Sequence, residues 1–324
     1  MSRALVSIVT PFFNTASYLE ECIRSVLAQT YGEFEYILVD NCSTDESAAI
    51  AEKYARLDPR IRFLRNERHL SQVANYNGAL RHVSEKSEFC KIVQADDWIF
   101  DRCIEAMVDV ATRCPTVGIV GAYTLNTDRV YLDGLRFENT VVNGKELCRR
   151  FVVEGLYVFG SPTAMLLRSS IVRSRPQFYE EHNPVEDFHV CVEILQSWDF
   201  GFVHQVLTYT RRDNESITSS QRGFKPLLMA RVTSLSRYGH LFLTAAEYRA
   251  CDRRLTHEHY LLLGEAVWRR RQGRFWAYQQ EGLRVIGQRI RWLRVSAYSL
   301  LVVAEHLLNP KRTLETAVRR FRRR

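Results

Sequence analysis

Short apolar runs alternate with amphipathic segments over residues 1–100. The apolar runs are rich in β-branched and aromatic residues, which is typical of buried strands, and the segments between them repeat apolar residues at helical spacing. This alternation predicts an α/β fold in which a mainly parallel sheet carries helices on both faces. The predicted strands are 4–10, 34–39, 61–65 and 89–95.

Three helices are expected between these strands. Two of them are expected to begin at S-x-x-E sequences, Ser17 to Glu20 and Ser43 to Glu46, because this spacing is typical of a capping box. The third helix is expected over 72–83.

The pattern is less regular between residues 100 and 220 and becomes helical after Pro226. We therefore expect an α/β domain over 1–222 and a helical C-terminal region over 223–324. The elements predicted in the less regular part are helices at 101–114 and 186–197 and strands at 117–123, 164–168 and 202–209.

The charge distribution supports this division. The chain holds 45 Lys and Arg and 37 Asp and Glu, which gives a net charge of +8. Residues 1–224 have 24 basic and 30 acidic residues, a net charge of −6, whereas residues 225–324 have 21 and 7, a net charge of +14. An acidic body with a basic C-terminal third indicates two parts with different partners.

Three further features favour a cytoplasmic location. No apolar run reaches the roughly 18–20 residues needed to cross a bilayer. The N-terminal residues 1–10 do not have the form of a signal peptide. The eight cysteines include no C-x-x-C pair, and scattered cysteines in apolar contexts are expected to be reduced thiols.

Polar residues stand at the carboxyl ends of the predicted strands, where parallel sheets bind ligands. Asp96 and Asp97 follow the fourth strand, and adjacent carboxylates repel each other unless a cation or solvent relieves them. A hard cation such as Mg2+ or Mn2+ takes oxygen ligands of this kind, while a solvated pair that caps the next helix is an equal alternative. Asp40 could accept the imide N–H of a uracil base, although an ordinary strand-to-helix turn is favoured for this residue alone.

Three segments taken together resemble a known family. They are TPFFN at 10–14, VDNCSTD at 39–45 and QADDW at 94–98. In this order and spacing they resemble the N-terminal half of a family 2, GT-A type glycosyltransferase, strongly over 4–100 and more weakly to about 220. The resemblance implies a GT-A fold with a C-terminal helical extension. It also implies transfer of a sugar from a nucleotide diphosphate donor to a hydroxyl group, with inversion at the anomeric carbon.

The resemblance implies roles for individual residues as well. Asp40 would bind the base, Asp96 would contact the ribose or a metal ion, and Asp97 would bind the metal. The cofactor, Mn2+ or Mg2+, would neutralise the charge that develops on the departing diphosphate. The residues that the resemblance places in the donor pocket are Thr10, Pro11, Asn14, Asp40, Asn75 and Asn77. For Asn75 and Asn77, a helix face that only packs on the sheet is an equal alternative.

An inverting displacement needs a base on the opposite face of the sugar. Glu186 and Asp187 open the helix predicted at 186–197 and match an acidic motif of the family, so the resemblance implies Asp187 as this base. The helix N-terminus is expected to hold its pKa down, and simple complementation of the helix dipole is the alternative role. Arg211 is expected to reach the diphosphate or to form a surface salt bridge. Asp213 stands where relatives often have histidine.

The C-terminal region interleaves arginines with aromatic residues over 268–294 and ends in the arginine-rich segment 311–324. This composition suits attachment of 268–324 to an anionic membrane surface, such as the inner face of the plasma membrane. A helical bundle packed on the catalytic domain and a dimer surface are the alternatives. Nucleic acid is not expected as a partner, because no recognition motif accompanies the arginines.

The expected function is a metal-dependent inverting glycosyltransferase in surface polysaccharide or glycolipid synthesis. It would use an NDP-sugar, with a UDP-sugar favoured, and a glycan or lipid-linked acceptor. A nucleotidyltransferase would need a basic or glycine-rich triphosphate loop after the first strand, which residues 12–15 do not supply. A non-catalytic scaffold or membrane-binding protein is the other alternative, and the presence of Asp96, Asp97 and Asp187 argues against it.

Overall fold

The structure, a computed structural model, describes residues 3–211 and 223–308. The chain forms two compact units, of which the first comprises Met1–His182 with Glu186–Ser220 and the second comprises Asn183–Val185 with Gln221–Arg324. Asp213 and the arginine-rich residues 311–324 lie outside the described residues.

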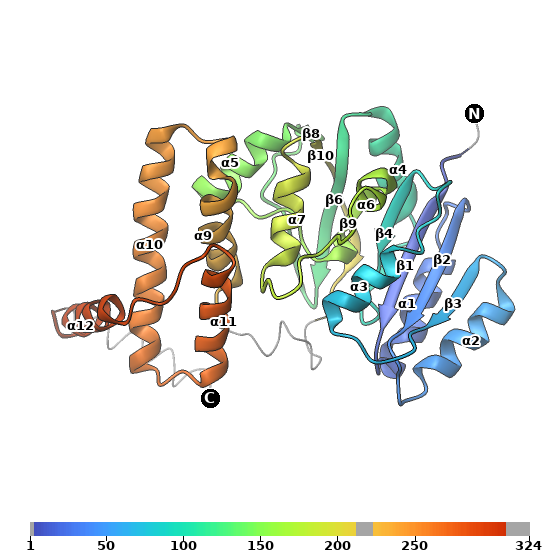
Figure 1. The fold of residues 1–324 in the computed structure, drawn as a ribbon. Helices are drawn as coiled ribbons and strands as arrows, with labels where there is room; N and C mark the ends of the chain where they lie inside the picture. Colours follow the sequence, from blue (N-terminus) through green and yellow to red (C-terminus); the bar gives the residue numbers. More distant parts are fainter. Residues whose placement is uncertain (1–2, 212–222, 309–324) are drawn as a thin grey trace. The chain divides into compact units, whose positions relative to one another are not determined.

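Four parallel strands joined by three helices form the N-terminal half of the sheet. These elements are β1 (Val6–Phe12), α1 (Ala16–Leu27), β2 (Phe34–Asp40), α2 (Ser47–Leu57), β3 (Ile61–Arg65), α3 (Gln72–Leu80) and β4 (Phe89–Ile92). The strands lie in the order β3-β2-β1-β4, as Figure 1 shows. Their registers place Phe12 beside Asp40 and Asp40 beside Arg65, so the carboxyl ends of β1, β2 and β3 meet at one edge.

A second set of strands continues the sheet beyond β4 and makes it mixed. These are β5 (Trp98–Ile99), β6 (Val117–Asn126), β7 (Arg129–Tyr131), β8 (Val141–Val142), β9 (Met165–Arg168) and β10 (Asp199–Tyr209). Strand β9 lies between β4 and β6 and is antiparallel to both, while β10 is parallel to β6 and β5 pairs antiparallel with β10. The mixed, mainly parallel α/β sheet followed by helices confirms the predicted fold class.

Among the described residues, the remaining helical elements of this unit are four α-helices and one 3-10 turn, which lie in sequence among the second set of strands. They are α4 (Cys103–Arg113), α5 (Gly144–Glu154), the 3-10 turn η1 (Pro162–Ala164), α6 (Ser169–Arg173) and α7 (Glu186–Ile194). The core of the sheet is apolar, and α1 contributes Leu19, Ile23 and Val26 to it from one helical face. This packing confirms the apolar stripe of the first predicted helix.

Two local predictions are wrong. The predicted capping boxes at Ser17 and Ser43 do not form: α1 has Thr15 as its N-cap and α2 has Glu46, each without a side-chain cap bond. Strand β4 also ends at Ile92, and a turn closed by the Asp97 N–H and the Gln94 carbonyl separates it from the acid pair. The acids therefore stand on a turn and not directly at a strand end.

The second unit is helical. Its elements are α9 (Pro226–Tyr238), the 3-10 turn η2 (Gly239–Leu241), α10 (Ala245–Trp268), α11 (Gly273–Arg284) and α12 (Trp292–Leu308). Leu263, Phe275 and Val295 belong to its own apolar core. The buried His259 pairs with Gln279 at 2.9 Å, and Gln279 donates to the Phe224 carbonyl. Among the described residues, no helix is both long enough and apolar enough to span a bilayer.

Candidate active site

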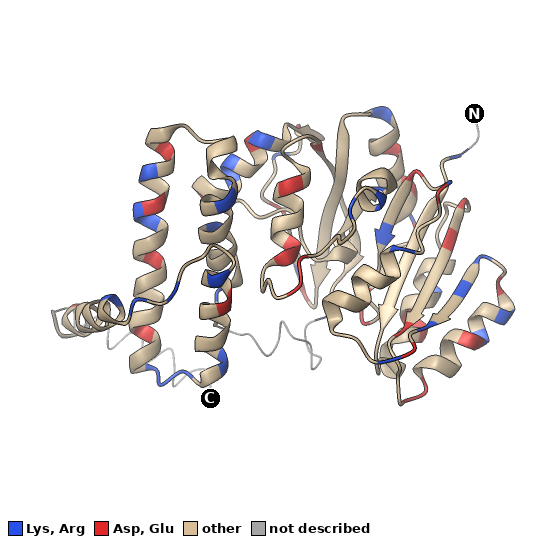
Figure 2. Cartoon of the chain, viewed as in Figure 1, with Lys and Arg blue, Asp and Glu red and all other residues tan. Residues whose placement is uncertain are grey.

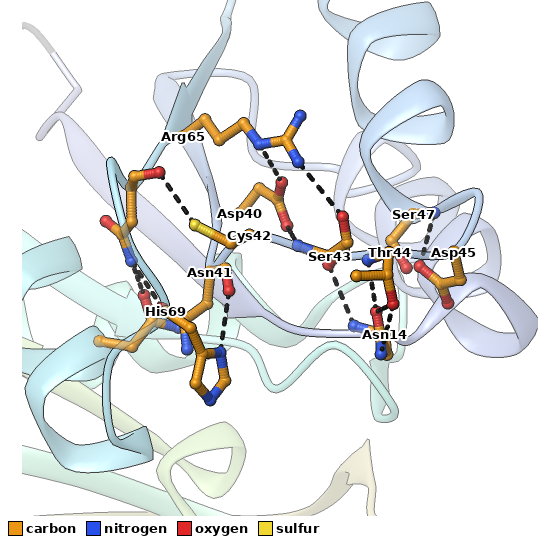
Figure 3. Close-up of polar contacts among 12 residues, drawn as sticks. Asn14, Asp40, Asn41, Cys42, Ser43, Thr44, Asp45, Ser47, Arg65 and His69 are labelled. Carbon is orange, nitrogen blue, oxygen red and sulfur yellow. Dashed lines mark hydrogen bonds and ion pairs between the residues drawn. The ribbon is translucent and has the colours of Figure 1, made fainter.

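Two loops at the carboxyl edge of β1 and β2 are joined by hydrogen bonds (Figure 3). Three successive N–H groups of the β1–α1 loop donate to side chains of the β2–α2 loop: Asn14 to Ser43 at 3.0 Å, Thr15 to Ser47 at 2.8 Å, and Ala16 to Asp45 Oδ2 at 3.0 Å. The Asn14 Oδ1 atom also accepts from the N–H of Thr44. Asn14 takes a positive φ of 50°, a conformation that Asn tolerates better than most residues.

Asp40 ends β2 beneath these loops and is fully buried. Its Oδ1 accepts the N–H of Ser43 at 2.8 Å, and its Oδ2 lies 3.1 Å from Nε of Arg65 in an ion pair. That ion pair lacks the alignment of a hydrogen bond, so the buried Oδ2 atom has no hydrogen-bond donor. The Arg65 cation compensates the charge of this oxygen, which retains lone pairs that can accept a further hydrogen bond, such as one from the N–H of a nucleobase.

A network of side-chain amides connects α3 to the residue that follows Asp40. Asn75 Oδ1 accepts from Asn66 Nδ2 at 2.8 Å, and the same nitrogen donates to Asn41 Oδ1 at 2.9 Å. Beside this network, the exposed ring of Phe13 lies 4.4 Å from the ring of His69. Asn75 thus fixes the residue that follows Asp40.

Asp97 is almost completely buried and both of its carboxylate oxygens are engaged. Oδ2 accepts from the Thr163 hydroxyl at 2.7 Å and Oδ1 accepts from the backbone N–H of Arg211 at 3.0 Å. Burial, reinforced by the negative charge of Asp96, raises the pKa of the Asp97 carboxyl to about 7. Thr163 is itself anchored, because its carbonyl accepts from the buried Lys91 Nζ at 2.7 Å.

Arg211, which follows β10, contacts the turn that carries the acid pair. Its Nε donates to the carbonyl of Asp96 at 3.1 Å, and its Nη2 lies 2.5 Å from Glu21 Oε2. The guanidinium also stacks over the rings of Tyr18 and Tyr209 at 4.7 and 5.8 Å. Arg211 therefore lies beside Asp96 and Asp97, with its cation held by groups on α1 and β10.

Asp187 lies in the first turn of α7, next to Glu186, and its Oδ1 accepts the N–H of Phe188 at 2.8 Å. Burial raises the pKa of both acids, so the expected lowering of the Asp187 pKa by the helix N-terminus is wrong. The desolvation of the carboxyl outweighs the stabilisation that the helix end provides. A raised pKa makes Asp187 a stronger base than an exposed aspartate.

Two tyrosines connect the region of Asp187 with that of the acid pair. The rings of Tyr76 and Tyr179 lie 6.1 Å apart. Burial is the main cause that raises the pKa of each phenol, but the charge of Asp187 contributes for Tyr179 and those of Asp96 and Asp97 contribute for Tyr76. Each tyrosine therefore lies within the electrostatic range of one of the two groups of acids.

The other predicted residues take structural positions. Thr10 is buried in β1, where its hydroxyl donates to the Val93 carbonyl at 2.8 Å and shares a hydrogen bond with Tyr36. Pro11 is buried beside it. Asn77 bonds to the backbone of residues 178–179, so it supports the chain that leads toward α7 rather than the loops around Asp40. Donor contacts by Thr10, Pro11 and Asn77 stay predictions.

The sequence reasoning missed residues that hold the predicted ones in place. Arg65 stands at the carboxyl end of β3, so the rule that found Asp40 could also have found Arg65. Thr163 and Glu21 carry no comparable signal, because their roles depend on contacts between residues far apart in the chain. These partners determine the orientation of Asp40, Asp97 and Arg211.

Asp96 and Asp97 fit a metal site that is shared with phosphates of a ligand, and not a site made of protein side chains alone. In the ranges 3–211 and 223–308 no three His, Cys, Asp or Glu side chains are arranged to hold a metal ion. A Mg2+ or Mn2+ ion shared with nucleotide phosphates needs only one or two carboxylates from the protein. Asp96 is partly exposed at this turn and can supply one. Each Asp97 oxygen already accepts one hydrogen bond, and metal binding by Asp97 stays a prediction. The residues fit a cation held jointly with a diphosphate.

The chain is similar in sequence to curated proteins that are named as glycosyltransferases. Glycosyltransferase GlyG of Streptococcus pneumoniae is 34% identical over 119 residues, which cover 37% of this chain and 39% of GlyG. The putative teichuronic acid biosynthesis glycosyltransferase TuaG of Bacillus subtilis is 29% identical over 132 residues, which cover 40% of this chain and 52% of TuaG. The chain thus spans about half the length, or less, of these two curated relatives.

Comparison with solved structures shows the fold. The structure of S. aureus TarS 1–349 in complex with UDP-GlcNAc superposes with a TM-score of 0.63 at 16% identity, covering 86% of this chain and 79% of that one. The mannosyltransferase PcManGT from Pyrobaculum calidifontis, in complex with GDP-Man and Mn2+, has a TM-score of 0.56 at 16% identity, covering 98% of this chain and 84% of that one.

The family model described as glycosyl transferase family 2 matches residues 7–175, which contain β1 to β4, Asp40, Asp96 and Asp97. This range is more than half of the chain, and it confirms the resemblance carried by the three motifs. The chain belongs to glycosyl transferase family 2.

Proposed function

We propose that this protein transfers a sugar from a nucleoside diphosphate sugar, with a UDP-sugar as donor, to a hydroxyl group with inversion at the anomeric carbon. The observation that carries the proposal is Asp40 at the ligand-binding edge of the sheet, where its Oδ2 atom is ion-paired with Arg65 but accepts no aligned hydrogen bond from a donor. The imide N–H of uracil would supply that donor. The UDP-GlcNAc complex of TarS, which has the same fold, supports this choice of donor.

The diphosphate would lie at the turn that carries Asp96 and Asp97. Asp96 would hold a Mn2+ or Mg2+ ion together with the phosphates, and this ion would supply neutralisation of the charge that develops on the leaving group. Asp97 would act as a positioning residue, because its hydrogen bonds to Thr163 and to the Arg211 backbone fix the turn. The Arg211 guanidinium would add a positive charge near the same phosphates.

Asp187 would be the base that takes the proton of the acceptor hydroxyl. As the acceptor oxygen forms its bond to the anomeric carbon, the bond to the diphosphate breaks and the proton passes to the Asp187 carboxylate. The raised pKa of Asp187 favours this proton transfer, because a stronger base needs less developed bond formation before it accepts the proton.

The acceptor would be a glycan or a lipid-linked sugar in surface polysaccharide or glycolipid synthesis. The printed name of TuaG, which refers to teichuronic acid biosynthesis, supports this class. The catalytic domain would comprise residues 1–222, and residues 223–324 would form a separate basic helical region. The protein would act in the cytoplasm. Residues 268–324 would attach it to the inner face of the plasma membrane, where such acceptors are found.

The donor assignment is tested by calorimetric titration of the full chain with UDP and Mn2+, alongside Asp40→Asn. We expect the variant to bind UDP about 10- to 100-fold more weakly, because a charge-assisted hydrogen bond is lost. Asp58→Asn is the matched control, since Asp58 also pairs with an arginine, Arg60, but outside this edge of the sheet. Failure of the wild type to bind UDP, or equal binding by Asp40→Asn, would reject the uracil site.

The catalytic assignment is tested by release of UDP from a panel of UDP-sugars with and without acceptors. Asp187→Asn is expected to keep UDP binding and to lose transfer, whereas Asp96→Asn is expected to lose the increase in affinity that Mn2+ gives. Wild-type turnover by Asp187→Asn would show that another group takes the proton.

A further inference from the structure

Helix α12 has one face that belongs to the core of the C-terminal unit. Val295, Ser299 and Val302 are buried on this face. The backbone of residues 298–299 approaches Gly264 of α10 so closely that a Cβ atom there would lie 2.8 Å from the Tyr298 carbonyl carbon. These contacts fix the rotation of α12 about its own axis.

The opposite face of α12 is apolar and exposed. Its leucines are among the most exposed large apolar residues of the described chain, with Leu293 at 90%, Leu300 at 69%, Leu307 at 75% and Leu308 at 85%. At 3.6 residues per turn these positions fall within an arc of about 100°. Members of this outer face, as we call it, are Leu293, Ala297, Leu300, Leu301, Ala304, Leu307 and Leu308.

Positive charge surrounds the start of this face. Arg289, Arg291 and Arg294 are exposed, and Glu305 is the one acidic residue in the sequence of α12. Figure 2 shows the arginines as blue segments before and at the start of a largely tan helix. The sequence after α12, residues 309–324, adds seven Lys and Arg against one Glu. An occupant of the outer face would therefore meet both leucines and a high positive charge.

The aromatic residues of the preceding segment do not form this face. Phe275 is buried in the core of the C-terminal unit, and Trp276 packs against that core and lies 5.0 Å from Trp292. Trp268 donates its indole N–H to the Ser299 carbonyl at 2.9 Å. Phe275 and Trp276 thus serve mainly to hold the helices together.

We infer that the outer face of α12 inserts into the interfacial region of an anionic bilayer, with the helix parallel to the membrane. An exposed leucine stripe bordered by arginines matches the chemistry of such an interface, where acyl chains take up the leucines and anionic headgroups pair with the arginines. The inference rests on the membrane attachment proposed above and narrows it to one surface. A second copy of this chain is a poorer occupant, because two such faces would bring their arginines together.

The test measures partition of the full chain onto vesicles of phosphatidylcholine and phosphatidylglycerol at a 3:1 ratio, and onto pure phosphatidylcholine. We expect binding to the anionic vesicles that weakens about tenfold or more in Leu300→Glu and in Leu307→Glu. Each change removes a leucine that would insert into the bilayer and adds a negative charge that the anionic headgroups repel. Leu57→Glu is the matched control, since Leu57 is 70% exposed on α2 and Leu300 is 69% exposed on α12. Circular dichroism confirms that each variant is folded.

The outcomes separate this inference from the proposals on which it rests. No binding of the wild type to anionic vesicles would reject membrane attachment altogether. Wild-type binding that Leu300→Glu and Leu307→Glu retain would reject only the outer face and leave attachment to the arginines. A wild-type dimer that Leu300→Glu converts to a monomer, without vesicle binding, would assign the face to a second copy. Release of UDP in solution should be equal in all variants, because the leucines lie in the C-terminal unit.

Discussion

The two buried asparagines of α3 are expected to have different roles, and Asn77→Ala tests this directly. Asn75 supports the loop after Asp40, whereas Asn77 supports the chain that leads toward Asp187. The Asn77 Oδ1 atom accepts from the N–H groups of Phe178 and Tyr179 at 3.1 and 2.8 Å, and its Nδ2 donates to the Tyr179 carbonyl at 2.8 Å. Asn77→Ala removes these three bonds and leaves three buried backbone groups without their partner. Asn75→Ala, at an equally buried position, removes the bond to Asn66.

The magnitudes follow from the number of bonds. At about 1 kcal/mol for each buried hydrogen bond, Asn77→Ala should lower the free energy of unfolding by about 3 kcal/mol and Asn75→Ala by about 1 kcal/mol. In a unit of this size, 1 kcal/mol shifts Tm by about 2–4 °C, so the expected shifts are about 6–12 °C and about 2–4 °C. Thermal and urea unfolding followed by circular dichroism measure both quantities.

The two variants should also differ in function. Asn77→Ala should slow transfer and keep UDP affinity, because Asn77 holds the backbone of Tyr179, whose phenol is within the electrostatic range of Asp187. Asn75→Ala should weaken UDP binding, because Asn66 then loses one of the bonds that hold the loop after Asp40. Equal losses of stability in both variants, or a larger loss of UDP affinity in Asn77→Ala, would refute the assignment.

Three further predictions follow from contacts of single residues. The rate of transfer should fall about tenfold per pH unit below the pKa of Asp187, because only the ionised carboxylate accepts a proton. Burial raises that pKa, so the fall should begin at a higher pH than for an exposed aspartate. A rate that is level down to pH 4 would contradict this. Thr163→Val removes a hydrogen bond to the Asp97 carboxylate, so it should lower the free energy of unfolding at pH 8 by about 1.5–3 kcal/mol, measured in urea. It should also raise the pKa of Asp97 above about 7. Thr163→Ser keeps the hydroxyl and should leave the stability and the pKa unchanged. Gly264→Ala should destabilise the C-terminal unit by about 1–3 kcal/mol in thermal unfolding, because the added Cβ atom meets the backbone of α12. A Cβ atom at Gly273 has open space, so Gly273→Ala is the control and should leave the stability unchanged. Equal Tm values for the two variants would contradict the close approach of α10 and α12.

The parallel half of the fold was predictable because its strands follow one another in the sheet with single helices between them. Strand β9 illustrates why the second half was not: residues 164–168 read as a strand, but their place between β4 and β6, antiparallel to both, depends on pairing between distant segments. The helix starts show a similar limit. Ser43 matches a capping box in sequence, yet its hydroxyl accepts from Asn14, whereas Thr244 and Glu247 form a capping box that was not predicted.

For the candidate site, the residue types at the strand ends could be predicted and their environments could not. Asp40 and Asp97 were found from their positions, but the arginine beside Asp40 and the threonine that bonds to Asp97 come from other strands and turns. The pKa of Asp187 was predicted in the wrong direction, because a helix start can be recognised in sequence while the burial of one of its side chains depends on tertiary packing.

The bonds between the loops of Asn14 and Ser43 bear on how tightly a nucleotide can be held. Fixing the backbone of one residue costs about 1–2 kcal/mol of conformational entropy, and these loops meet that cost when the protein folds. A ligand that binds there finds the backbone already ordered by the N–H groups of residues 14–16. Nucleotide affinity at this edge should therefore depend on the atoms of the base and phosphates, with little loss from rearrangement of the loops that receive them.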